Sequence, residues 1–196
     1  MRRKKVYKNY GDYVEGYKGR QFQKLKKTMT RDVIVSGYGL PTREYDGKFP
    51  EDYWPYWEDE NGLKVPVEEI DLSEPSAKDL IDHGWTPVTK FWYYGWIGNI
   101  KFDVLTPERT TNKMKLGLVT VDNKIYNTVQ CGECKGITEK VAIEFTENKD
   151  KYIGTVIEVE CNGVFENTGM LRHPRYLRMR EDKVFSDCTW KNHIEG

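Results

Sequence analysis

The chain has 196 residues, 38% of them hydrophobic and 32% charged, with a formal net charge of zero. This length fits one domain, or a small domain with part of another, and the composition permits a buried core. Zero net charge argues against a general nucleic-acid coat, and the sequence contains no apolar run near the ~18 residues of a membrane span. No apolar segment follows the basic N-terminus, so we expect an intracellular, cytoplasmic protein that does not contact membranes.

The charges are unevenly distributed along the chain. Residues 1–31 carry eleven Lys or Arg and two acids, whereas residues 41–83 carry thirteen acids and four Lys or Arg. A basic arm and an acidic segment in one chain indicate local electrostatic roles rather than a uniform field.

Residues 1–20 are rich in Tyr and Gly and are expected to form a loop or a weak strand. Residues 21–27 alternate, which places Lys24 and Lys26 on one face of a strand. Two ammonium groups at this spacing can reach the same anion, although lysine also commonly marks a solvated sheet edge. Residues 31–37 are β-branched and predict a short strand.

Residues 41–90 mix acidic and aromatic residues and show little regular pattern. A stretch of this length is either a functional insertion or partly disordered. Ser73-Glu74-Pro75 signals a short helix that runs to about His83 and stops at Gly84. We expect the aromatic residues to pack this insertion onto the barrel that the rest of the chain forms. The alternative is a loop that faces a partner or DNA, although its acidity disfavours a direct contact with the DNA backbone.

The remainder of the chain is typical of a β-sheet with one helix. Asp122-Asn123 is a compact turn signal between two strands. Two glycines in residues 88–104 indicate a bent strand, of the kind that a small barrel needs. The expected strands are 88–104, 113–120, 124–129 and 152–160, and the expected helix is 137–147.

The last predicted strand is rich in arginine. Residues 171–183 contain five Lys or Arg and two acids, and charged residues alternate with apolar ones from Arg175 to Glu181. Planar guanidinium groups bind phosphate oxygens in pairs, although a solvated edge strand is the alternative. The order of three strands, a helix and two strands predicts a mostly β protein with an OB-fold, a five-stranded barrel with one helix.

The four cysteines lack a secretory context and are expected to be reduced. Cys131 and Cys134 have the spacing of half a zinc site, but Cys161 and Cys188 stand alone. Free thiols near turns are therefore the expectation, with no metal site, and zinc binding is the alternative.

Three segments resemble ATP-dependent DNA ligases. Arg-His-Pro-Arg-Tyr-Leu-Arg-Met-Arg-Glu-Asp-Lys, residues 172–183, resembles nucleotidyltransferase motif VI, and residues 16–26 resemble the approach to motif V. Residues 147–160 look like the fourth strand of the ligase barrel. The resemblance implies a nucleotidyltransferase remnant with motif V and a hinge at 1–30, an OB domain at 31–190 with an insertion at about 41–90, and a tail at 191–196.

The resemblance also implies roles for individual residues. In such ligases the motif V lysines and the motif VI side chains contact nucleotide phosphates, with ATP and Mg²⁺ as cofactors and nicked double-stranded DNA as the substrate. The implied phosphate-binding residues are Lys24, Lys26, Arg178, Arg180 and Lys183, with Asp182 orienting one of them. The implied DNA-backbone contacts are Lys27, Arg172 and Arg175.

The nucleophilic lysine of the ligase motif Lys-x-Asp-Gly is missing; the nearest string is Glu44-Tyr45-Asp46-Gly47. The resemblance is thus to the C-terminal part of a ligase, inactive alone. A split gene with an N-terminal half acting in trans is our first expectation; a remnant, a truncated chain or a separate binding role also fits. The alternatives are a stand-alone single-strand-binding OB module that stacks bases on Trp92, Tyr94 or Trp96, and the same architecture from an RNA ligase or capping enzyme.

Overall fold

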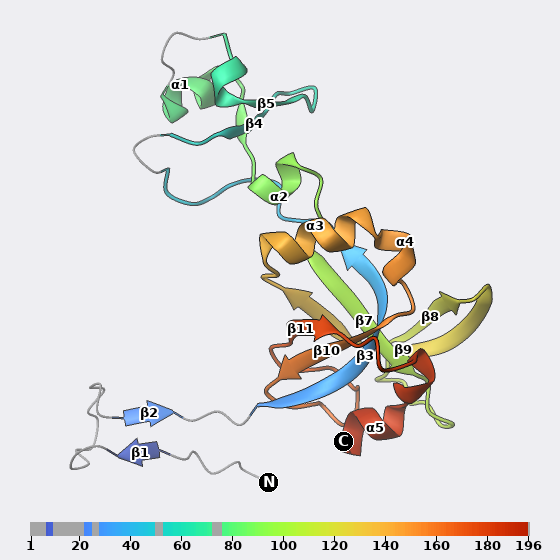
Figure 1. Ribbon diagram of the computed structural model, residues 1–196. Helices are drawn as coiled ribbons and strands as arrows, with labels where there is room; N and C mark the ends of the chain where they lie inside the picture. Colours follow the sequence, from blue (N-terminus) through green and yellow to red (C-terminus); the bar gives the residue numbers. More distant parts are fainter. Residues whose placement is uncertain (1–6, 10–21, 25–27, 50–52, 72–75, 196) are drawn as a thin grey trace.

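An antiparallel sheet of six strands is the main element of the computed structural model, which describes residues 7–9, 22–24, 28–49, 53–71 and 76–195 (Figure 1). The mostly β expectation is confirmed, but six strands are joined where five were expected. In sheet order they are β11 (Arg175–Met179), β10 (Val156–Cys161), β3 (Met29–Gly39), β7 (Asn99–Leu105), β9 (Lys124–Lys135) and β8 (Leu116–Val121).

Strand β3 lies in the middle of this sheet, paired with β10 on one side and β7 on the other. Its β-branched residues Val33, Ile34 and Val35 are fully buried. Burial of each of these side chains stabilises the fold by about 1.5–3 kcal/mol relative to exposure to water. The segment predicted as a short strand is therefore longer and forms the centre of the core.

The predicted strand 88–104 is wrong in its first half. Residues Lys90–Tyr93 form a helix, α2, because the Thr89 hydroxyl caps it by accepting the Trp92 N–H at 3.3 Å. Gly95 follows with φ of 69°, a conformation that glycine adopts readily. The strand proper, β7, begins only at Asn99.

The hairpin of β8 and β9 confirms the turn prediction. Asp122 and Asn123 have φ of 49° and 61°, the positive angles of a two-residue hairpin turn. Strand β9 runs to Lys135, however, six residues past its expected end. Cys131 and Cys134 consequently lie inside a strand rather than near turns, and all four cysteines of the chain are buried free thiols.

The predicted helix is present as α3 (Glu139–Glu147), with Thr138 as its cap and Ala142 and Phe145 buried against the sheet (Figure 1). The strand expected from residue 152 starts four residues later. A short helix, α4 (Lys149–Tyr152), and Gly154 at φ of 84° precede β10, so the chain turns before it extends.

The described part of the insertion has its own small core. Its three-stranded sheet has the order β5 (Lys64–Pro66), β4 (Tyr56–Glu58) and β6 (Thr86–Pro87), and its helices are the 3₁₀ helix η2 (Val67–Glu69) and α1 (Ala77–Asp82). Trp57 and Leu80 are buried within it, and Tyr45 stacks on Trp54 with ring centroids 3.6 Å apart. The ring contacts of the described aromatic residues thus lie chiefly inside the insertion, and Tyr56 contacts Tyr93 of α2, with ring centroids 4.9 Å apart.

Helix α1 ends where the sequence predicted. His83 is its C-cap and Gly84 follows with φ of 86°. At the other end Ser76 and Asp79 form a capping box, in which each side chain accepts a backbone N–H of the other residue. The expected start signal, residues 73–75, lies outside the described residues.

Near the two chain ends the remaining elements are short. Strands β1 (Tyr7–Asn9) and β2 (Phe22–Lys24) pair with each other, and η3 (Phe185–Asp187) and α5 (Trp190–Glu195) follow β11. The expected tail 191–196 is therefore mostly helix, and His193 in α5 is buried. None of the helices in the described part of the chain has the length and apolar character of a bilayer span.

Candidate functional site

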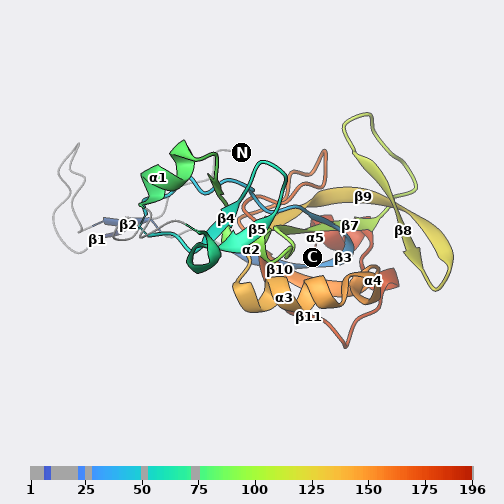
Figure 2. The ribbon, with the colours of Figure 1, turned by 90° about the horizontal axis from the view of Figure 1, so that it is seen from above.

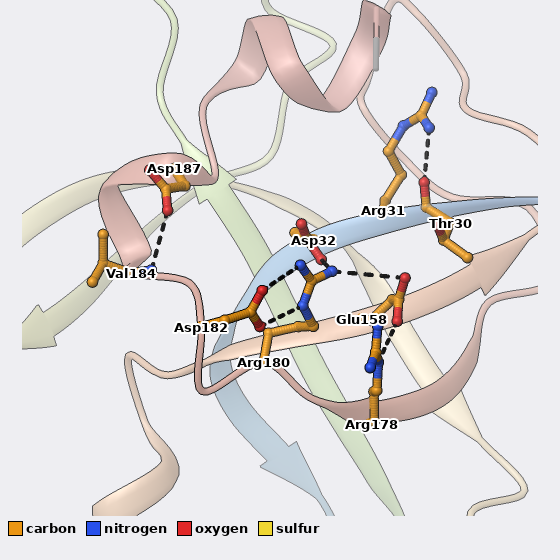
Figure 3. Close-up of polar contacts among 9 residues, drawn as sticks. All are labelled: Thr30, Arg31, Asp32, Glu158, Arg178, Arg180, Asp182, Val184 and Asp187. Atoms are coloured by element: carbon orange, nitrogen blue, oxygen red, sulfur yellow. Dashed lines mark hydrogen bonds and ion pairs between the residues drawn. The ribbon is translucent and has the colours of Figure 1, made fainter.

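The arginine-rich strand β11 presents one of its arginines to a row of charges across three strands (Figure 3). Antiparallel pairing puts Arg178 of β11 opposite Glu158 of β10, and Glu158 opposite Asp32 of β3. Directly opposed residues share a face of a sheet, so the three side chains form a row on one face. Arg178 donates its Nε–H to Glu158 Oε2 at 2.7 Å.

Arg180 crosses this row and is held by three carboxylates (Figure 3). Its Nε and Nη2 donate to the two oxygens of Asp182 at 2.8 and 2.9 Å, a bidentate pair. Its Nη1 donates to Asp32 at 2.9 Å and lies 3.7 Å from Glu158 Oε1. Only 15% of the Arg180 side chain is exposed, so this guanidinium is committed to internal contacts.

The pKa values of this cluster follow from its contacts. The hydrogen bonds from Arg180 lower the pKa of Asp182 to about 2, and the hydrogen bond from Arg178 lowers that of Glu158. The same contacts with Asp182, reinforced by Asp32, raise the pKa of Arg180. Asp182, Glu158 and Arg180 are therefore charged at neutral pH, and the cluster joins two arginines to three acidic residues.

Arg178 differs from Arg180 in that most of its guanidinium group remains accessible to solvent. Its side chain is 66% exposed, and only its Nε is engaged by a described residue. The two terminal Nη groups are free to bind an anion from solvent, in the planar geometry that suits phosphate oxygens. A phosphate can reach Arg180, in contrast, only by displacing the carboxylate of Asp182.

A cavity of about 690 Å³ adjoins this cluster. Arg180 and Lys183 line it from the end of β11, and Lys151 lines it from α4. Tyr176 faces it as well, and burial raises the pKa of this phenol to about 12, so that it stays protonated. The cavity thus offers ammonium groups and hydrogen-bond donors together with the carboxylates of Glu144 and Glu181.

The two candidate DNA-backbone contacts near β11 are exposed. Arg175 begins β11 opposite Glu160 and takes part in no ion pair within the described residues. The Arg172 guanidinium lies over the Phe165 ring, 4.6 Å from its centroid. His173 between them has φ of 51° and lies in a bend just before the strand.

The lysines from the N-terminal part remain predictions. Lys24 is in β2, paired with Tyr7 of β1, whereas Lys26 and Lys27 lie outside the described residues. The site therefore brings together Arg178, Arg180 and Asp182, with Lys183 nearby. Sequence reasoning missed Glu158, which contacts both arginines, and Asp32, which binds Arg180.

The aromatic residues proposed for base stacking are already engaged with protein groups. Trp92 donates its Nε1–H to Glu58 at 2.6 Å, and the Lys64 ammonium lies over its ring. Tyr94 stacks on Trp96 with centroids 4.8 Å apart. Of these three, Tyr94 is the most open, with 51% of its surface exposed.

Within the residues that the structure describes, no group of three or more His, Cys, Asp or Glu is arranged to hold a metal ion. Burial raises the pKa values of Cys131, Cys134 and Cys188. No protein-family model and no curated protein matches this chain.

Proposed function

We propose that the chain is the C-terminal OB-fold part of an ATP-dependent DNA ligase. In this proposal β3, β7, β9, β10 and β11 are the five barrel strands, and β8 is an added hairpin strand. Two observations support the barrel: α3 lies between the third and fourth of these strands, and the Leu171 N–H donates to the Cys131 carbonyl of β9 at 2.8 Å, just before β11. That hydrogen bond links the segment that leads into β11, the fifth barrel strand, to β9, the third.

The observation that carries the functional proposal is the exposed Arg178 fork, whose two Nη groups suit phosphate oxygens of ATP or of nicked duplex DNA. Arg178 itself does not line the cavity; there Lys183 and Lys151 supply ammonium groups that would bind further phosphate oxygens. ATP with Mg²⁺ would supply the adenylate; the residues of this chain would bind and orient its phosphates. Arg172 and Arg175 would contact the DNA backbone, with little sequence preference.

The chain would be inactive alone because it contains no Lys-x-Asp-Gly. Another polypeptide segment must then carry the nucleophilic lysine. The test mixes this chain with the nucleotidyltransferase domain of an ATP-dependent DNA ligase and measures sealing of a labelled nicked duplex. We expect sealing only in the mixture, and a large loss with Arg178→Ala. No sealing by any such mixture would contradict the proposal.

Binding to DNA gives a second readout. The affinity for nicked duplex should fall steeply with salt, with a slope of about 0.9 per phosphate contact. Arg175→Gln should reduce both the affinity and the slope by about one contact, whereas Lys78→Gln on the exposed face of α1 should change neither. A salt-independent affinity would argue strongly against phosphate recognition.

A stand-alone module for single-stranded nucleic acid is the second candidate. The outward face of Tyr94, supported from behind by the stacked Trp96 ring, is the observation that favours it. This function predicts tighter binding to an unpaired oligonucleotide than to nicked duplex, and a loss of that binding with Tyr94→Ala. The ligase proposal predicts the opposite order of affinities.

A further inference from the structure

The β8–β9 hairpin exposes an apolar face to solvent. Directly opposed residues share a face, so Leu118 lies with Asn127 and Thr120 lies with Ile125. Leu116, Leu118 and Ile125 are 58%, 64% and 70% exposed. The opposite face is covered, since Val119 is buried there. Three large aliphatic side chains on one hairpin face are more than scattered surface exposure.

Lysines are adjacent to these apolar residues along the chain. Lys113, Lys115 and Lys124 are exposed, and none of them forms an ion pair with another described residue. Asp122 at the turn is the only acid between residues 113 and 127. We call residues 113–127 the basic hairpin; its surface fits a partner that is both apolar and negatively charged.

The insertion carries a surface of the opposite charge. Leu63, just before β5, is 59% exposed, and Tyr53, before β4, is 47% exposed. We call residues 53–71 the acidic hairpin, because its sequence has six acids and a single cation, Lys64, which donates to the Trp92 carbonyl at 2.6 Å. The acids are Glu58, Asp59, Glu60, Glu68, Glu69 and Asp71.

Hydrogen bonds favour the charged form of two carboxylates of the acidic hairpin. The Leu63 N–H donates to Asp59 at 2.7 Å and lowers the pKa of that carboxyl, with help from Asn61. The Tyr53 hydroxyl donates to Glu68 and lowers the pKa of Glu68 too. Asp59 and Glu68 therefore keep their negative charge over the whole neutral range.

The two hairpins cannot cover each other within one molecule, because they lie apart in both views (Figures 1 and 2). We propose that the basic hairpin of one copy of this chain docks on the acidic hairpin of a second copy. Leu116, Leu118 and Ile125 would cover Leu63 and Tyr53, and the lysines would face the acids. The interface joins two different surfaces, so association is head to tail and can extend beyond a dimer.

A nucleic acid would satisfy the lysines of the basic hairpin but would leave most of its aliphatic surface without an apolar counterpart. The acidic hairpin supplies both carboxylates for the lysines and apolar side chains for the aliphatic surface. A second copy of the chain is therefore the better fit. Two hairpins bury little area, so the affinity should be weak, on the order of 0.1 mM.

Sedimentation velocity tests this proposal on the full chain. Between about 10 µM and about 1 mM protein, the weight-average sedimentation coefficient should rise at low salt and much less at high salt. A coefficient that does not change with concentration would overturn the proposal. So would a monomer whose binding to duplex DNA is lost when the basic hairpin is altered, because DNA would then be the partner of that surface.

Two variants on exposed positions make the test specific. The first, Lys115→Glu with Leu118→Asp, alters the basic hairpin; the second, Glu60→Lys with Leu63→Asp, alters the acidic hairpin. Each alone should stay monomeric, with an unchanged circular dichroism spectrum. Mixed together they should form a dimer and nothing larger, since each retains the surface that the other has lost. Association of either variant alone at the level of the unaltered chain would overturn the proposal, as would the absence of a dimer in the mixture.

Discussion

Arg180 and Asp182 join through two parallel hydrogen bonds of 2.8 and 2.9 Å, although only one residue separates them. The contact closes a tight turn in the chain just after β11. It leaves Nη1 of Arg180 to donate to Asp32 in β3. One guanidinium thus ties the edge strand, its loop and the central strand together.

Replacing Arg180 with Ala should destabilise the protein more than replacing Arg178. Removal of Arg180 leaves Asp32, Glu158 and Asp182 close together without their shared cation, whereas removal of Arg178 leaves Glu158 still near Arg180. Urea unfolding checks this. The midpoint should fall for both variants, and further for Arg180→Ala; the reverse order would show that Arg180 does not anchor the cluster.

Acid should weaken the same cluster. The folded-state pKa of Asp182 is about 2, below its ordinary value of 3.8, and that of Glu158 is also lowered. The stability from these pairs is therefore present above about pH 4 and is lost as the pH falls toward 2. Chemical unfolding at a series of acid pH values should show a shallower loss in Asp182→Asn than in the unaltered chain.

Asp103 is a buried carboxylate that depends on two hydroxyl groups. Ser36 and Thr128 each donate to one of its oxygens at 2.6 Å, and Asp103 is only 2% exposed. Thr128→Val keeps the shape but removes one donor, which should cost about 1–3 kcal/mol in the free energy of unfolding. Thr120→Val on the exposed face of β8 is the matched control. Equal effects of the two changes would contradict this account.

His193 should make the stability depend on pH around neutrality. Its Nε2 lies 2.7 Å from the Gly169 carbonyl and its buried Nδ1 has no partner, while the backbone carbonyl of His193 accepts from Arg31 at 2.7 Å. Burial lowers the pKa of His193 below 6.5, and the nearby Arg31 lowers it further. The unfolded chain then binds a proton more readily, so the free energy of unfolding should fall as the pH drops below about 6.5.

His193→Gln is the control for this pH dependence, because the amide can still donate to the Gly169 carbonyl but does not titrate. In the window just below pH 6.5 its stability should vary less with pH than that of the unaltered chain. Parallel curves for the two proteins would mean that His193 is not responsible.

Trp92 should hold the insertion against the main sheet. Its indole N–H donates to Glu58, which is only 5% exposed and otherwise meets Arg43 at 3.4 Å. Trp92→Phe should speed amide hydrogen exchange in residues 56–66 by roughly tenfold, since local opening costs less once this hydrogen bond is gone. Trp96→Phe removes a similar indole that does not contact Glu58, and it should leave this exchange unchanged.

The sequence predicted best where local signals were strong. The spacing of Val141, Ala142 and Phe145 identified α3, and Asp122-Asn123 identified a hairpin turn. Residues 90–93 misled the analysis because Phe, Trp and Tyr favour strands. The hydroxyl of Thr89 and the packing of the insertion outweigh that preference.

The candidate site was only half visible for a different reason. The arginines are recognisable in the sequence because they lie in a basic stretch. Asp32 and Glu158, in contrast, look like ordinary outward residues of two distant strands. Their meeting with Arg178 depends on the pairing of β3, β10 and β11, including an irregularity between Glu158 and Val159. Strand register across 150 residues is not encoded in any local pattern.

The placement of the cysteines has a practical consequence for experiments. All four are buried, and burial raises the pKa values of Cys134 and Cys188 to about 12. Alkylating reagents, which attack the thiolate, should therefore react with the native protein very slowly. A single cysteine placed on either hairpin would take a fluorescent dye selectively, and energy transfer between differently labelled copies could then follow their encounter directly.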